Sequence, residues 1–148
     1  MLKNIDPLLS ADLLHFLASM GHGDDLALVD ANHPAETVAG GKRLIRLPGL
    51  SMERVARAIL SVLPIDDFEP NPLRRMEMVG NPAEIPQVQR AVQAEIDRVV
   101  PGQPVLAGIE RFAFYEAAKA GFGVIQVGDP RPYGCFLFRK GVIAGEPG

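Results

Sequence analysis

Apolar residues along this chain follow two patterns, one typical of amphipathic helices and one typical of buried strands. Between residues 13 and 20 they recur at helical spacing behind Ser10, which can cap a helix, and Gly21 is placed to end that helix as a left-handed cap. The continuous apolar run at 26–29 predicts a buried strand. We therefore expect a helix that leads directly into a strand.

The same two patterns continue through the rest of the sequence. Residues 31–42, with Pro34 and a pair of glycines, are predicted to form a loop, and residues 65–72, with three acids and two prolines, a surface excursion. The apolar spacing predicts helices at 51–62, 83–99 and 112–120, and strands at 43–47, 73–79, 105–109, 123–127 and 135–139.

This alternation predicts an α/β fold in a single domain, residues 1–148, with three layers in which helices cover both faces of a central sheet. No internal repeat, low-complexity segment or linker divides the sequence. Ligands of such sheets bind beyond the carboxyl ends of the strands. Asp30, the pair Glu110 and Arg111, and the loop at 128–133 follow predicted strands, so we expect the site among them.

Composition narrows the choice of partner. The 148 residues include 15 basic and 18 acidic ones, a net charge of −3, which leaves no basic footprint for nucleic acid. Tryptophan is absent and aromatic residues make up 6%, which argues against an extended aromatic platform. The sequence shows neither a signal-like segment nor an apolar run of membrane-spanning length, and its one cysteine, Cys135, permits no intrachain disulfide. We expect a cytoplasmic protein with a small ligand and no membrane or nucleic-acid partner.

His22 lies between two glycines, just before the predicted strand that ends on Asp30. The glycines give the backbone around this histidine unusual freedom, and the ordinary pKa of a histidine, ~6.5, makes both protonation states accessible near neutral pH. His22 and Asp30 are therefore candidates for acid/base chemistry. The alternative for His22 is a polar histidine that only hydrogen-bonds the last turn of the preceding helix.

Phosphate and metal binding fit this segment less well. A phosphate-binding loop needs Gly-Lys-Ser/Thr opening a helix, whereas this segment follows a helix and carries Asp24 and Asp25, which would repel a phosphate. A metal site built from His22, Asp24, Asp30 and His33 would follow no recognised ligand spacing. We expect a neutral, polyhydroxylated ligand and no metal.

Short motifs spread over nearly the whole chain resemble, in order and spacing, the motifs of one known family. They are Leu2-Lys3-Asn4-Ile5, Pro7-Leu8-Leu9-Ser10, Met20-Gly21-His22-Gly23-Asp24, Asp30-Ala31, Pro34-Ala35, Arg111-Phe112-Ala113-Phe114-Tyr115-Glu116, Tyr133-Gly134 and Lys140-Gly141-Val142. The chain resembles the L-fucose mutarotase branch of the ribose pyranase and fucose mutarotase family. This resemblance implies a small α/β subunit that assembles into rings, typically decamers, and interconverts ring forms of free sugars without a metal or organic cofactor.

The resemblance also implies roles for individual residues. His22 would be the catalytic proton donor, and the sugar would be bound by Asp30, Arg111, Tyr133, Gly134 and Cys135. Further candidates are Tyr115, Glu116 and His33.

Each binding role has a plainer alternative. Asp30 could be an ordinary turn aspartate after a strand, and Arg111 could pair with Glu110 or Glu116 on the surface. Tyr115 could belong to the core. His33, where the family commonly has an aromatic residue, lines the mouth of the sugar site or lies at a subunit contact.

Cys135 is the clearest departure from the family pattern, because it replaces the asparagine of a Tyr-Gly-Asn triplet. A thiol is a weak hydrogen-bond donor and acceptor, so the identity of the sugar is open. L-fucose or a related monosaccharide is expected, with D-ribose pyranase activity or a non-catalytic sugar-binding or transport-accessory role as alternatives. A nucleophilic Cys135 is disfavoured, since a lone cysteine that enters an apolar strand is usually buried and inert.

Overall fold

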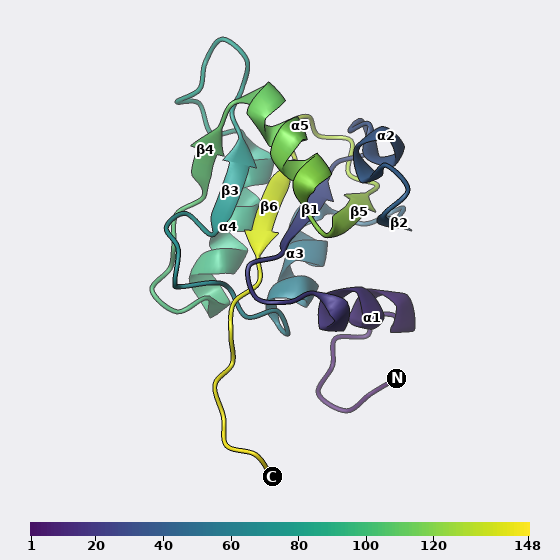
Figure 1. Cartoon of the computed structure of the whole chain (residues 1–148). Helices are drawn as coiled ribbons and strands as arrows, with labels where there is room; N and C mark the ends of the chain where they lie inside the picture. Colours follow the sequence, from purple (N-terminus) through teal and green to yellow (C-terminus); the bar gives the residue numbers. More distant parts are fainter.

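The computed structural model describes residues 1–148 and is built on one mixed sheet of six strands in the order β2-β5-β1-β6-β3-β4 (Figure 1). The strands are β1 (Asp25–Val29), β2 (Arg43–Leu47), β3 (Leu73–Met76), β4 (Ala107–Ile109), β5 (Gly123–Val127) and β6 (Phe136–Arg139). Only β6 is antiparallel to its neighbours, β1 and β3. The carboxyl ends of the other five strands therefore meet the start of β6 at one edge, called here the carboxyl edge. The opposite edge is the amino edge.

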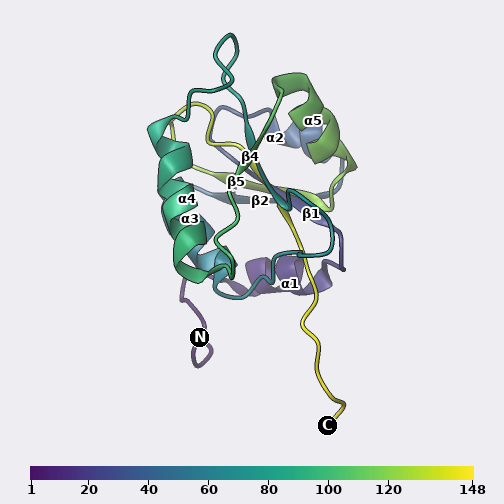
Figure 2. The same ribbon diagram turned by 90° about the vertical axis from the view of Figure 1, so that its left-hand side faces the viewer.

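Five helices cover the two faces of the sheet: α1 (Ala11–Ser19), α2 (Ala35–Ala39), α3 (Met52–Leu60), α4 (Gln87–Val99) and α5 (Arg111–Ala120). Figure 2 shows α3 and α4 on one side of the sheet and α2 and α5 on the other. Strand β1 feeds both layers, because Leu26 and Leu28 join the core under α1, α3 and α4, whereas Ala27 and Val29 join the core under α2 and α5. The predicted three-layer α/β fold is confirmed.

Helix caps fix where several of these helices begin. The Ser10 hydroxyl accepts a hydrogen bond from the backbone N–H of Leu13 at 3.2 Å, and Ser51 caps α3 in the same way. The prediction for Gly21 is wrong: α1 ends at Ser19, Met20 is extended, and the left-handed glycine of this turn is Gly23, with φ of 86°.

Lys140 explains why α1 needs no left-handed glycine at its end. Its Nζ donates hydrogen bonds to the carbonyl oxygens of Leu17 and Met20, at 2.8 and 2.6 Å. The ammonium group therefore satisfies carbonyls that a glycine-terminated turn would otherwise bond.

The predicted loop at 31–42 contains a short helix, α2, so that prediction is wrong. Pro34 and Gly40 are its boundary residues, because Pro34 stands at the N-cap and Gly40 adopts a left-handed conformation with φ of 57° at the C-cap. Five residues are too few to form a stable helix alone. Burial of Ala35, Val38 and Ala39 against the sheet holds the turn in place.

Several predicted elements exist with shorter bounds. Helix α4 begins at Gln87 rather than at residue 83, because Pro86 restricts the residue before it to extended backbone and occupies the N-cap. Strand β3 ends at Met76 rather than at residue 79. None of the five helices combines the length and hydropathy that a membrane crossing would require.

Candidate active site

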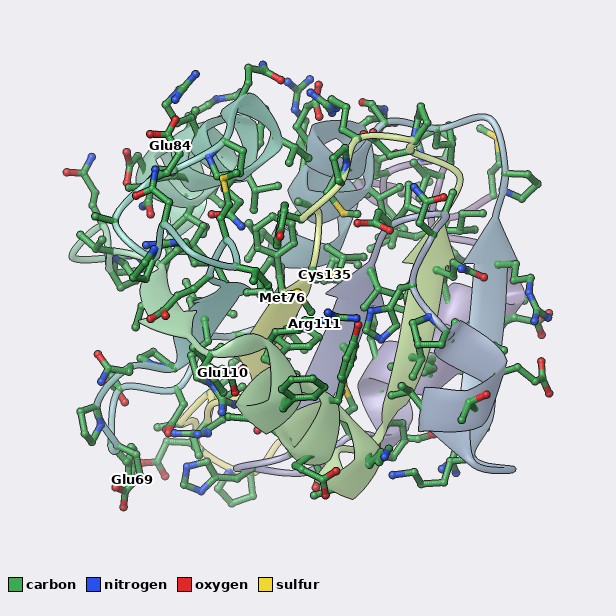
Figure 3. All side chains as sticks on the ribbon, turned by 90° about the horizontal axis from the view of Figure 1, so that it is seen from above. Glu69, Met76, Glu84, Glu110, Arg111 and Cys135 are labelled. Carbon is green, nitrogen blue, oxygen red and sulfur yellow. The ribbon has the colours of Figure 1, made fainter.

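Side chains from several elements surround a pocket of about 240 Å³ at the carboxyl edge. Its lining consists of Asp30, Asn32, His33, Met76, Arg111, Tyr115, Pro132, Tyr133 and Cys135. Figure 3 looks onto this edge and shows Met76, Arg111 and Cys135 close together beside the start of α5. The structure thus brings together most of the residues that the sequence predicted to form the site. We call this the carboxyl-edge pocket.

Asp30 is the buried carboxylate of this pocket, with 3% of its surface exposed. Oδ1 accepts the backbone N–H of Asn32 at 2.9 Å, and Oδ2 accepts the backbone N–H of Gly134 at 3.1 Å. Burial raises the pKa of Asp30, while these N–H donors and the Cys135 thiol oppose that rise. Asp30 therefore ties the end of β1 to the start of β6 and presents its remaining acceptor capacity to the pocket.

His33 and Cys135 form a buried polar pair beside Asp30. The Cys135 Sγ lies 3.5 Å from Asp30 Oδ2 and 3.5 Å from His33 Nδ1. Burial, followed by the charge of Asp30, raises the pKa of Cys135 well above its ordinary value, so the thiol stays protonated and inert. Burial lowers the pKa of His33 to about 4, so its ring is neutral at pH 7. A nucleophilic role for Cys135 has no support in this environment.

Tyr133 is held in an unusual conformation at the rim of the pocket. Its φ of 63° is rare for a residue with a Cβ. The side chain of Gln89 on α4 donates a hydrogen bond to the Tyr133 carbonyl oxygen at 2.9 Å. The Tyr133 hydroxyl accepts a hydrogen bond from the backbone N–H of Val79 at 3.2 Å. The phenolic proton remains available for a ligand oxygen.

Arg111 and Tyr115 enter the pocket from the first turns of α5. The Arg111 Nε donates a hydrogen bond to the Tyr115 hydroxyl at 3.2 Å, and this contact is the main cause that raises the pKa of Arg111. Neither Glu110 nor Glu116 pairs with Arg111: Glu110 caps α5 through the N–H groups of residues 112 and 113, and Glu116 pairs with Lys119. Glu116 is exposed and does not line the pocket.

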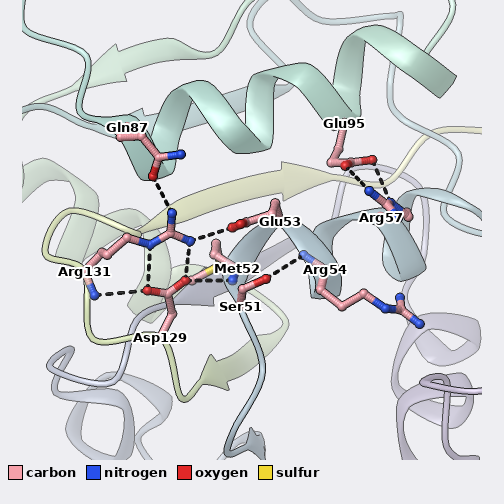
Figure 4. Close-up of polar contacts among 9 residues, drawn as sticks. All are labelled: Ser51, Met52, Glu53, Arg54, Arg57, Gln87, Glu95, Asp129 and Arg131. Carbon is pink, nitrogen blue, oxygen red and sulfur yellow. Dashed lines mark hydrogen bonds and ion pairs between the residues drawn. The ribbon is translucent and has the colours of Figure 1, made fainter.

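An ion-pair network anchors the loop that carries Tyr133 (Figure 4). Asp129 is buried and accepts the backbone N–H of Met52 at 2.8 Å and the Arg131 guanidinium at 2.6 and 3.0 Å. Arg131 also bonds Glu53 at 2.5 Å and the side chain of Gln87. The Arg131 guanidinium lowers the pKa of Asp129 to about 2. The loop is therefore fastened to the starts of α3 and α4.

His22 lies at the other edge of the sheet, where it contacts a carboxylate that sequence analysis did not single out. Its Nε2 is 3.1 Å from Asp66 Oδ1; 43% of the His22 side chain is exposed, against 1% of the Asp66 side chain. Burial opposes ionisation of Asp66, but the N–H groups of Phe68 and Glu69 and the His22 ring together hold its pKa below the usual range. We call His22 and Asp66 the amino-edge dyad.

Within one chain the amino-edge dyad and the carboxyl-edge pocket are far apart. His22 precedes β1 and Asp30 follows it, so the five residues of β1, roughly 16 Å of extended chain, separate them. Asp24 precedes β1 and His33 follows it, so the four side chains considered as metal ligands do not form one cluster.

Sequence reasoning had no means to find Asp66. It is one of three acids in the segment at 65–72, and the pattern does not distinguish it from Asp67 or Glu69. The structure does: Asp66 is buried and its backbone N–H bonds the Arg139 carbonyl at 3.0 Å, whereas Asp67 and Glu69 are exposed. Phe68, two residues later, packs edge-on against His22 with ring centroids 4.8 Å apart.

Comparison with known proteins gives one consistent result. The model of the RbsD / FucU transport protein family matches residues 3–143. Human fucose mutarotase is 39% identical over 150 residues, which cover 99% of this chain and 97% of that protein. The crystal structure of the Streptococcus pneumoniae fucose mutarotase in complex with L-fucose superposes with a TM-score of 0.88 at 30% identity, over 97% of this chain and all of that one. Bacillus subtilis RbsD, complexed with D-ribose, has the same fold at 21% identity with a TM-score of 0.71 over 97% of this chain and all of that one.

Proposed function

Because the chain belongs to the RbsD/FucU family, we propose that it is a monosaccharide mutarotase, an isomerase that interconverts the α and β anomers of free L-fucose or a related sugar. The observation that carries this proposal is the amino-edge dyad, an exposed histidine bonded to a buried carboxylate. A histidine hydrogen-bonded to a carboxylate can act as a general acid and base without any cofactor.

Anomer exchange requires only proton transfer and rotation. A base takes the proton of the anomeric hydroxyl, the bond between the anomeric carbon and the ring oxygen breaks, and an acid protonates that oxygen. The resulting aldehyde rotates and closes on its other face by the reverse steps. A positioned acid/base group contributes roughly 10²–10⁴-fold to such a reaction.

The hydrogen bond to Asp66 sets the proton positions on His22. An ionised carboxylate only accepts hydrogen bonds, so Nε2 of His22 carries the proton in the neutral ring and Nδ1 has a free lone pair. Nδ1 takes the sugar proton, and the Asp66 charge stabilises the imidazolium that forms. The ring then returns the proton to the sugar.

The carboxyl-edge pocket supplies the groups that a polyhydroxylated ligand needs. Asp30 can accept hydrogen bonds from sugar hydroxyls, and the Arg111 guanidinium and the Tyr133 phenol can donate hydrogen bonds to sugar oxygens. Gly134 and Cys135 shape the floor beside Asp30, and Tyr115 and His33 complete the wall. Glu116 lies outside this pocket, so we leave it out of the binding set.

We place the complete site between two copies of the chain. One copy cannot bring its dyad and its pocket to the same sugar, because they lie at opposite edges of the sheet. Exposed aromatic rings flank both halves: Phe68, beside His22, is 70% exposed and Phe112, beside Arg111, is 66% exposed. Burial of these rings against a neighbouring copy favours association. A closed ring, a decamer included, repeats this contact with no unpaired half-site.

Assembly and location can each be tested. Light scattering after size-exclusion chromatography should give the mass of a ring, and a stable monomer that still accelerates anomer exchange would refute the shared site. The free buried thiol of Cys135 fits a reducing compartment, so a cytoplasmic location belongs to this proposal. Fractionation of cells that express the protein tests it.

The substitution His22→Ala separates catalysis from binding. Saturation-transfer NMR on a panel of L-fucose, D-ribose, galactose and rhamnose should show accelerated exchange for at least one sugar, fastest for L-fucose. In His22→Ala the rate should fall roughly 10²–10⁴-fold, toward the spontaneous rate, while the sugar still binds. His15→Ala is the matched control, because His15 is an exposed histidine on α1 that neither contacts Asp66 nor lines the carboxyl-edge pocket. Binding without acceleration in the unsubstituted protein would identify a non-catalytic sugar-binding protein, and preference for D-ribose would identify a pyranase.

A further inference from the structure

A second cavity lies between α4 and the segment that leads into β4. Its volume is about 450 Å³, and it shares no lining residue with the carboxyl-edge pocket. The lining is partly apolar, with Ile85, Val105 and Leu106, and it carries two arginines, Arg75 and Arg90. The mechanism proposed above uses none of these residues.

Arg75 is a buried cation without an anionic partner. It is 8% exposed, and its guanidinium bonds only neutral groups: Nη1 donates to Gln89 Oε1 at 3.3 Å and Nη2 to the Pro82 carbonyl at 3.1 Å. Its Nε has no hydrogen-bond partner. The neighbouring Arg74, on the same strand, also has an Nε without a partner, but its Nη2 pairs with Asp25 at 2.5 Å, so its charge is balanced. A buried charge without a counter-charge is costly, so an anion beside Arg75 would stabilise its guanidinium.

The two positive charges that line the cavity are separated along α4 from its one negative charge. Arg90, on the first turns of α4, lines the same cavity and bonds only the Ile85 carbonyl. The one acid in the lining, Asp97, lies seven residues further along α4, roughly 10 Å away, and accepts a hydrogen bond from Gln93. Glu77 packs beside Gly108 and forms no ion pair with Arg75.

We propose that this cavity binds the oxyanion of a small metabolite, a phosphate or carboxylate group, between Arg75 and Arg90. The planar guanidinium presents donors that match such a group, and the Nε of Arg75 is the donor left without a partner. The apolar lining covers the body of the ligand.

Gln89 couples the oxyanion site to the carboxyl-edge pocket. Its Oε1 accepts from Arg75, and its Nε2 donates to the carbonyl oxygens of Met76 and Tyr133 at 2.7 and 2.9 Å. An anion that draws the Arg75 guanidinium toward itself changes the hold on Tyr133. We expect bound phosphate to change the KM for the sugar more than kcat, a consequence that rests on the proposed mutarotase function.

The binding itself is tested without reference to activity. Inorganic phosphate is titrated into the full chain at constant ionic strength, balanced with sodium chloride, and NMR follows the amides of α4 and the Nε–H of Arg75. We expect saturable shifts confined to the cavity. Acetate in a parallel titration distinguishes the two sources of the oxyanion: stronger phosphate binding indicates a phosphorylated ligand and stronger acetate binding a carboxylated one.

Three variants decide the result. Arg75→Gln should weaken binding by roughly tenfold or more, because a charge-assisted hydrogen bond is lost. Arg90→Gln, at the exposed rim, should weaken it roughly twofold to fivefold and does not depend on how the core tolerates a change at Arg75. Arg98→Gln is the control, since Arg98 lies on α4 outside the cavity and pairs with Glu95. No saturable shift, or equal binding by Arg90→Gln and Arg98→Gln, would overturn the proposal, whereas loss of mutarotase activity alone would not.

Discussion

Burial decides the chemistry of His33 and Cys135 more than residue type does. Histidine and cysteine are both candidates for catalysis from sequence, yet here one is held neutral and the other protonated. Conversely His22, which is exposed, has a buried carboxylate as its partner. The sequence pointed to His22 and Asp30 through their places beside an apolar run. It could not show Asp66, because the burial of an acid in a loop is set by tertiary contacts.

His33 makes acid stability depend on pH in a predictable window. The unfolded chain binds a proton at this residue near pH 6.5, whereas the folded chain does so near pH 4. Protonation of His33 therefore favours unfolding between these values, and the contribution of His33 to stability should fall as pH decreases from 6.5 to 4 and stay constant below pH 4. Between pH 6.5 and 4 the free energy of unfolding of the unsubstituted protein should fall by up to about 3 kcal/mol more than that of His33→Phe. Urea unfolding at intervals of pH measures it, and parallel curves for the two proteins would contradict it.

At the scale of elements, regular apolar patterns gave correct predictions, whereas a pattern interrupted by proline and glycine did not. Strand β5 was predicted with the observed bounds, and α3 from its capping serine, because each buries a regular apolar face. Helix α2 was missed because five residues carry too little pattern, and its Pro and Gly boundaries also mark loops. Strand order, including antiparallel β6, depends on contacts across the chain that no local pattern contains.

The loop between β5 and β6 depends on the ion pair between Asp129 and Arg131. Asp129→Asn should destabilise the protein by about 2 kcal/mol at pH 7, because the folded-state pKa of Asp129 is about 2 and its ordinary value is 3.8. This stabilisation is present above pH 4 and is lost as pH falls toward 2, so the difference between the variant and the unsubstituted protein should shrink in that range. Urea unfolding at pH 7 and pH 2 checks this.

The matched control is Glu36→Gln, which breaks the exposed pair between Glu36 and Arg46. It should change stability little, because exposed ion pairs contribute little. Equal losses in the two variants would show that the buried Asp129 pair does not anchor the loop. An effect of Asp129→Asn that persists undiminished at pH 2 would show that its charge is not the cause.

At the scale of the whole molecule, the fold separates the two halves of the proposed site. From the sequence, His22, before the strand, and Asp30, after it, are expected to serve one sugar site, whereas within one chain the structure places them at opposite edges of the sheet. The family resemblance implied a ring of several copies, but neither spacing nor periodicity reveals which surfaces of those copies meet. The dyad, the pocket and the exposed rings beside each are explained together if neighbouring copies complete one another.

Mixing two inactive variants tests this central claim most directly. His22→Ala lacks the dyad and Asp30→Asn lacks the carboxylate of the pocket, and each alone should leave anomer exchange near the spontaneous rate. Oligomers reassembled from equal amounts should regain about a quarter of the activity, because a quarter of the shared sites then receive both intact halves. Saturation-transfer NMR on the sugar that the unsubstituted protein exchanges fastest reports the recovery. Exchange that stays at the spontaneous rate in mixed oligomers would contradict a site shared between copies.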